Sequence, residues 1–224
     1  SIDMDNDGDQ DLIAAITDTF TGWITWYENL DGQGTFGEEN LLIENWEEFF
    51  KIMMIDIDGD GNKDILAVGE SYAPASIFWY KNMGNATFGA AQTIYQFQTL
   101  LSDWTSISYL QVSDINTDGK KDIIITTYHD DDGIFVYWLE NLDGLGNFGS
   151  LQYIDNTNDA YLFYDLDNDD DNDMLLYSIY TNKISWKKNE DGLGNFGAPI
   201  IISPNGDFER DADAADIDGD GWLD

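Results

Sequence analysis

Five short acidic segments recur along this sequence, and their closely spaced carboxylates are its clearest candidates for a chemical role. The clearest one, residues 56–64, reads DIDGDGNKD and has aspartate at positions 1, 3, 5 and 9 of its nine residues. Carboxylates this close repel one another strongly unless a cation lies between them. Ca²⁺ is the simplest candidate, because it takes about six to eight oxygen ligands from carboxylates, carbonyls and water. Gly61 at position 6 allows the sharp turn that folds the loop over the ion.

The same nine-residue pattern begins at Asp3, Asp56, Asp114, Asp165 and Asp216, and we call the copies loops 1 to 5. We predict up to five calcium ions, about one in each loop. The ligands would be the acidic residues, Asn116 at position 3 of loop 3, and the residue at position 7 of each loop. Asn62, at position 7 of loop 2, would give its carbonyl. The predicted metal ligands are Asp3, Asp5, Asp7, Asp9, Asp11, Asp56, Asp58, Asp60, Asn62, Asp64, Asp114, Asn116, Asp118, Lys120, Asp122, Asp165, Asp167, Asp169, Asp171, Asp173, Asp216, Asp218, Asp220, Trp222 and Asp224.

The segments around the loops distinguish them from EF-hands. An EF-hand loop needs a glutamate at position 12 and a helix on each side. In the first four loops the twelfth residue is alanine, isoleucine or leucine. Short apolar runs rich in β-forming residues, such as 52–55 and 65–68, flank the loop and predict strands. The pattern therefore indicates a calcium loop between two strands.

A second motif lies between the loops and shows that the repeat is larger than a metal site. It reads WYENLDGQGTFG from Trp26, and related segments begin at Trp79, Trp138 and Trp186 and end in Phe-Gly. We expect these repeating tryptophans to pack in the core. Each repeat is interpreted as four short strands, with an Asp-Gly or Asn-rich hairpin turn between the third and the fourth. In the second repeat the predicted strands are Phe50–Ile55, Ile65–Val68, Ser76–Tyr80 and Ala91–Tyr95.

The spacing of 51 to 58 residues from loop to loop is typical of propellers, solenoids or arrays, and the four short strands in each repeat predict an all-β fold. Four antiparallel strands repeated around an axis make a β-propeller, with a solenoid as the competing geometry. We expect residues 1–224 to form a single propeller region with four full repeats and the start of a fifth. Because the sequence begins and ends inside the loop motif, we expect an excerpt of a longer chain and part of a larger propeller.

The composition limits the partners and the compartment. With 42% apolar residues and a formal net charge of −36, the chain is a folded acidic protein rather than a disordered acidic tail. The negative charge makes nucleic acid a poor partner and disfavours anionic membranes. The absence of cysteine excludes disulfides and thiolate metal sites. No apolar stretch approaches the roughly 20 residues that span a bilayer.

The two motifs, in fixed order over essentially the whole chain, resemble the FG-GAP/VCBS repeat family. That resemblance implies β-propeller blades with calcium in the D-x-D-x-D-G-x-x-D loop, in the form found in large secreted or surface proteins of bacteria and related to integrin α-chain repeats. Two departures are Asn116 at position 3 of loop 3 and Asp170 at the glycine position of loop 4. Asp170 must adopt a positive φ with a side chain present. We expect both loops to bind calcium less tightly than loop 2.

The expected function is that of a non-enzymatic, calcium-stabilised module at the cell surface or outside the cell, serving adhesion, display or assembly. We expect a protein or glycan partner, or self-assembly, at the variable loops between strands, of which residues 96–106 form the most apolar. One alternative is a carbohydrate-active enzyme or glycan-binding propeller similar to polysaccharide lyases; another is a subunit of an extracellular filament or sheath. No Ser-His-Asp or paired-carboxylate arrangement stands apart from the loops, which disfavours the enzyme.

Overall fold

The computed structural model describes residues 3–5, 7–17, 22–45, 49–69, 75–97, 105–129, 133–157, 160–178, 183–204 and 213–223. These residues form strands and turns without any helix, so none of them belongs to an apolar helix that could cross a membrane. The chain divides into two compact units. The first comprises Ser1–Trp104 with Asp143–Asn147, and the second comprises Thr105–Leu142 with Phe148–Asp224.

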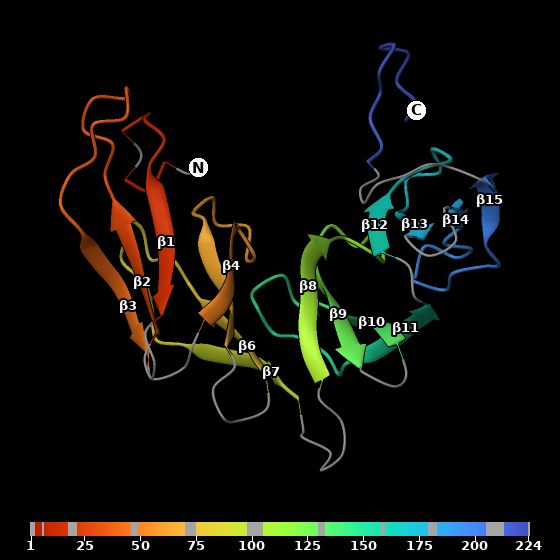
Figure 1. Cartoon of the computed structure of the whole chain (residues 1–224), viewed down its shortest axis with the longest axis horizontal. Coiled ribbons are helices and arrows are strands. Elements are labelled where there is room, and N and C mark those ends of the chain that lie inside the picture. Colours follow the sequence, from red (N-terminus) through yellow and green to blue (C-terminus); the bar gives the residue numbers. More distant parts are fainter. Residues whose placement is uncertain are drawn as a thin grey trace. The chain divides into compact units, whose positions relative to one another are not determined.

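The first unit contains a three-stranded sheet in the order β1-β2-β3 and a four-stranded sheet in the order β4-β5-β6-β7 (Figure 1). All neighbouring strands are antiparallel. The strands are β1 (Leu12–Thr17), β2 (Gly22–Tyr27), β3 (Asn40–Asn45), β4 (Phe49–Ile55), β5 (Asp64–Gly69), β6 (Ser76–Tyr80) and β7 (Gln92–Gln96).

The second unit contains two four-stranded antiparallel sheets, in the orders β8-β9-β10-β11 and β12-β13-β14-β15 (Figure 1). The strands are β8 (Thr105–Ser113), β9 (Asp122–His129), β10 (Gly133–Leu139), β11 (Gln152–Thr157), β12 (Ala160–Tyr164), β13 (Asp173–Ser178), β14 (Lys183–Lys187) and β15 (Ile200–Ser203).

Consecutive strands pair in sequence order in every sheet, which is the arrangement of a propeller blade. The predicted all-β fold is therefore confirmed. The third predicted strand of the second repeat, Ser76–Tyr80, coincides with β6, and the other three differ from β4, β5 and β7 by a residue at one or both ends. Among the described residues the first sheet has three strands, and none of them lies ahead of loop 1. Whether the chain forms part of a larger propeller stays a prediction.

Each unit has an apolar core built from residues of both of its sheets. In the first unit Ile24 and Ile43 pack with Ile65, Ala67, Phe78 and Tyr80. In the second unit residues of β9 and β10 pack with Phe163, Met174 and Leu176. Every residue of β5 and β6 is buried. This burial explains why these strands are almost continuously apolar instead of alternating.

A hairpin glycine packs against a buried tryptophan of the preceding repeat. In the first unit, a Cβ added to Gly146 would lie 1.9 Å from Cζ3 of Trp79, and the Gly146 carbonyl accepts a hydrogen bond from Gln92 Nε2. In the second unit, a Cβ on Gly194 would lie 3.1 Å from Cζ3 of Trp138. Both glycines have positive φ, +89° and +84°. Trp79 and Trp138 are buried, as expected of the repeating tryptophans, whereas Trp26 and Trp186 are only half-buried.

Candidate metal centres

The aspartate at position 1 shapes each acidic loop by accepting two backbone hydrogen bonds. In loop 2, Asp56 accepts from the N–H groups of Asp60 at 3.1 Å and Gly61 at 3.0 Å. The same pair of bonds, from positions 5 and 6, occurs in loops 1, 3 and 4, and loop 5 also has it. Position 6 has positive φ throughout, including Asp170 at +70°, as predicted for this residue. The loops therefore share one backbone fold despite their sequence differences.

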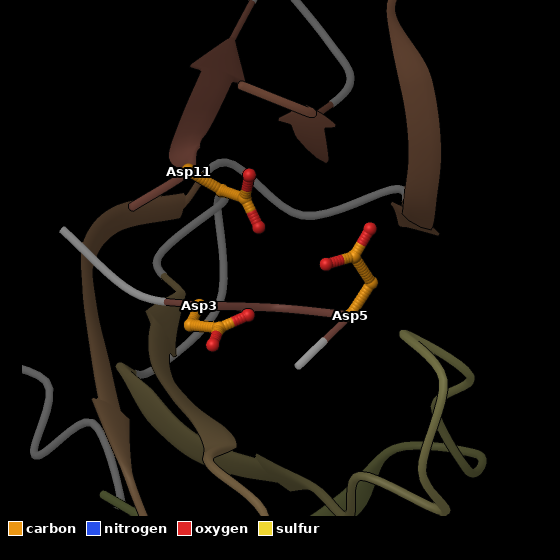
Figure 2. Close-up of side chains that lie close together, drawn as sticks. All are labelled: Asp3, Asp5 and Asp11. Carbon is orange, nitrogen blue, oxygen red and sulfur yellow. The ribbon is translucent and has the colours of Figure 1, made fainter. Parts of the chain in front are cut away.

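This backbone fold brings aspartates together in four of the five loops. In loop 1, oxygens of Asp3, Asp5 and Asp11 lie within 4.8 Å of one another, and their carboxylates face a common space (Figure 2). The equivalent positions 1, 3 and 9 meet in loops 2 and 4, and positions 1, 3 and 5 meet in loop 5. Loop 3 has no such group of three carboxylates among the described residues, because Asn116 occupies position 3.

The aspartate at position 9 is buried and has a structural role that does not require a metal. In loop 2, Asp64 accepts the N–H of Ile57 at 3.1 Å with one oxygen and the N–H of Asn82 at 2.8 Å with the other. Asp11, Asp122 and Asp173 make the same two bonds in their repeats. This carboxylate therefore ties the start of the loop to the hairpin that follows the third strand.

The asparagine of that hairpin is a second residue that holds loop and hairpin together, and no role was predicted for it from the sequence. Asn189 is fully buried; its Nδ2 donates to the carbonyls of Ile115 and Asn172, and its Oδ1 accepts the N–H of Gly194 at 3.0 Å. Asn29, Asn82 and Asn141 likewise donate to the carbonyl at position 8 of their loops. The signal was available, since this asparagine recurs in all four copies of the second motif.

The residue just before the asparagine reaches the acidic loop, and its charge differs between repeats. Lys81 pairs with Asp58 and Asp60 of loop 2, the latter at 2.9 Å, and Lys188 pairs with Asp167 and Asp169 of loop 4. In repeats 1 and 3 the same position is glutamate. Glu28 lies within 4.8 Å of Asp5 and Asp7, and Glu140 Oε1 accepts from Asn116 Nδ2 at 3.2 Å.

The electrostatics of the loops follow this difference. Burial, together with repulsion from neighbouring carboxylates, raises the pKa of Asp5 in loop 1. In loop 2 the pKa of Asp60 is lowered by the N–H of Asn62 and by Lys81, and in loop 4 the pKa of Asp169 is lowered chiefly by Lys188. Desolvation raises the pKa of Asp171 to about 6, and repulsion from Asp169 adds to the shift. Uncompensated negative charge thus remains in loop 1 and at Asp171.

The donor set fits a hard divalent cation. All the converging atoms are carboxylate oxygens, which Ca²⁺ and Mg²⁺ prefer. Asp167 Oδ1 and Asp171 Oδ1 in loop 4 are buried without a hydrogen-bond partner, a costly arrangement that a bound cation would relieve. The lysine ammonium groups of Lys81 and Lys188 occupy the place of a cation at their loops. A metal bound here would neutralise charge and hold the loop, which is a structural role.

The remaining predicted ligands lie apart from these groups. Asp9 and Asp171 at position 7 belong to none of the carboxylate clusters among the described residues. Lys120 pairs with Asp118 at 2.7 Å, and Trp222 is 55% exposed. Asp224 lies outside the described residues, as do most of the variable loops that we expected to bind partners. Metal binding by any of the predicted residues stays a prediction.

Comparison with known proteins gives one family match and ten structural similarities, two of which are described below. No curated protein matches the sequence. A solved structure of an Agrocybe aegerita lectin that recognises terminal N-acetylglucosamine shares 17% identity, with a TM-score of 0.42 over 88% of this chain and 66% of that one. A Photorhabdus luminescens Tc holotoxin pore shares 15% identity, with a TM-score of 0.41 over 98% of this chain and 13% of that one. The chain therefore spans less than two thirds of either structure's length.

The sequence itself places the chain in a family. The model of the FG-GAP-like repeat matches residues 3–67, 56–125 and 165–224, and each match begins at an acidic loop. Together these matches cover well over half of the sequence, as the resemblance of the two motifs predicted. The chain belongs to the FG-GAP-like repeat family.

Proposed function

We propose that this chain is a non-enzymatic β-propeller-like module of an extracellular or cell-surface protein, stabilised by calcium and serving adhesion, display or assembly. The observation that carries the proposal is the recurrence of one loop geometry in which aspartates at positions 1, 3 and 9 converge within 4.8 Å. Membership of a repeat family whose units carry such loops supports it. The partner, a protein or a glycan, would bind at the variable loops between the strands.

Calcium would act on stability. The position 1 carboxylate already holds the turn and the position 9 carboxylate is already buried, so the loop is shaped before an ion arrives. An ion would remove the repulsion that remains between carboxylates. Extracellular calcium modules bind with Kd of about 10⁻⁴–10⁻³ M. At about 10 mM Ca²⁺, each filled loop would then add roughly 1.4–2.7 kcal/mol to the free energy of unfolding.

Calorimetric melting of the chain in Ca²⁺ and in chelator tests the proposal. For a chain of this size, 1 kcal/mol corresponds to roughly 2–4 °C in Tm, so filling two loops would raise Tm by roughly 6–20 °C. Asp5→Asn, which removes a converging carboxylate, should lose part of this gain. Asp31→Asn, in an exposed hairpin outside the loops, is the matched control and should keep it. A chain that melts at the same temperature in both conditions refutes the calcium role.

A further inference from the structure

The four repeats present the residue before the hairpin asparagine from the same backbone position. Its carbonyl accepts the N–H of the glycine in the Phe-Gly motif, at 2.8–2.9 Å in each repeat, as seen for Gly37, Gly89, Gly149 and Gly197. The next residue is the asparagine whose N–H is held by the position 9 aspartate. The carbonyl of this residue and the N–H that follows it are therefore both held by hydrogen bonds. Because the backbone is fixed in this way, the side chain at this position lies beside positions 3 and 5 of the acidic loop.

In repeats 2 and 4 this position supplies a cation from the chain itself. Lys81 contacts one carboxylate at position 3 and one at position 5, and Lys188 makes the same two contacts in loop 4. Two repeats thus arrive at the same arrangement with different surrounding sequences. An ammonium group among the carboxylates repels an incoming divalent cation and occupies one oxygen of each carboxylate that it contacts.

In repeats 1 and 3 the position supplies a further anion. Glu28 forms a second cluster with Asp5 and Asp7, next to the cluster of Asp3, Asp5 and Asp11 that shares Asp5 with it. In loop 3, Glu140 lies beside Asn116 and so places a carboxylate next to the position where the aspartate is missing. Loop 1 thereby gains negative charge, whereas in loop 3 Glu140 only restores the charge lost at Asn116, and Lys120 pairs with Asp118.

We propose that the residue before the hairpin asparagine sets the metal affinity of the acidic loops, with Glu28 making loop 1 a tighter divalent-cation site and Lys81 and Lys188 serving loops 2 and 4 as built-in counterions. In loop 3, Glu140 only replaces the carboxylate that is missing at position 3. This inference rests on the proposed calcium role and deepens it. The chain then contains two kinds of repeat, one held by metal and one held by its own lysine.

The test combines calcium titration calorimetry with melting in chelator, on the whole chain and on charge-removing variants. Lys81→Gln should tighten calcium binding at one weak site at least tenfold, and Glu28→Gln should weaken one tight site at least tenfold. In chelator, Lys81→Gln should melt below the wild type and Glu28→Gln above it, because the first exposes repulsion and the second relieves it. Lys187→Gln, which breaks a pair with Asp155 outside the loops, and Glu39→Gln, on an exposed segment, are the matched controls.

The outcomes separate this inference from the calcium role itself. Calcium uptake that is the same in Lys81→Gln, Glu28→Gln and their controls overturns the inference and leaves the calcium role intact. No calcium uptake by the wild type overturns the calcium role and, with it, the assignment of metal affinity. Should Lys81→Gln not fold in chelator, Lys81→Glu folded in Ca²⁺ gives the answer. The inference expects this variant to gain a tight site in loop 2, and the absence of that site refutes it.

Discussion

Replacing Gly146 by alanine tests the contact between the hairpin of the third repeat and Trp79. The new Cβ would lie 1.9 Å from Cζ3 of a buried indole, and other ring atoms lie at 2.5 and 2.6 Å. Either the ring or the hairpin must move. Gly34 is the matched control, because it holds the same hairpin position in the first repeat, has φ of +94° against +89°, and has nothing within 4 Å of an added Cβ.

The expected difference follows from these two sites. Alanine at a left-handed φ costs roughly 1–2 kcal/mol, and this strain applies to both variants. Overpacking against Trp79 adds roughly 1–3 kcal/mol to Gly146→Ala alone. At roughly 2–4 °C per kcal/mol, the Tm of Gly146→Ala should fall roughly 2–12 °C below that of Gly34→Ala. Gly194→Ala should lie between them, since its Cβ would be 3.1 Å from Trp138 and 3.2 Å from Ile115.

Differential scanning calorimetry in saturating Ca²⁺ measures the Tm of the three variants. Saturating Ca²⁺ keeps the metal content of the acidic loops the same in all three. A double variant adds a second check, because Trp79→Leu removes the ring and should abolish most of the extra cost of Gly146→Ala. If Gly146→Ala has the same Tm as Gly34→Ala, or if the extra cost of Gly146→Ala is unchanged in the Trp79→Leu background, the predicted contact between the hairpin and the tryptophan is refuted.

Two further predictions concern the buried polar groups. Asn189→Ala should lower the free energy of unfolding by roughly 2–4 kcal/mol, because it leaves the carbonyl of Ile115 and the N–H of Gly194 without their partner. Urea unfolding measures this loss. An effect no larger than that of Asn195→Ala, at an exposed position of the same hairpin, would contradict the prediction. In chelator, the free energy of unfolding should rise as the pH falls from about 7 to about 4. Burial raises the pKa of Asp122 and of Asp171 to about 6 from the usual 3.8. The folded state therefore binds more protons than the unfolded chain in this pH range, and protonation stabilises it. The expected gain is about 2 kcal/mol from the buried Asp122 and less from the partly exposed Asp171, where solvent screens the charge. Ca²⁺ should reverse this trend by favouring ionised carboxylates. Unfolding curves in chelator that do not change between pH 7 and pH 5 would refute the pH prediction.

The strands and the loop turns could be predicted from sequence because their signals are local. The apolar run of β6 is bounded by turn residues, and the positive φ of Asp170 follows from its place in a nine-residue pattern. The positive φ at position 4, which Thr117 and Asn168 adopt without being glycine, was not predicted. A threonine there gives no conformational signal of its own, so only the folded loop reveals it.

The ties between loop and hairpin could not be derived from sequence because no residue type marks the backbone groups that take part in them. The position 9 aspartate was predicted only as a metal ligand, yet both of its oxygens accept backbone N–H groups, one of them 16 to 19 residues away. Backbone N–H groups are present at every residue except proline, so the sequence does not mark which one pairs. The ion pairs of Lys81 and Lys188 with their loops depend on the same alignment of hairpin and loop, which the sequence does not mark.

The tie made by the position 9 aspartate also bears on how the chain folds and on how the repeat number can change. Each tie closes a segment of 16 to 19 residues inside a single repeat. Closing so short a segment costs little chain entropy compared with joining distant strands, and contacts of short range form early. A repeat can therefore assemble its own loop and hairpin before it meets a neighbour. A unit that carries its own closure can be copied or deleted as a block, without altering the residues that close the others.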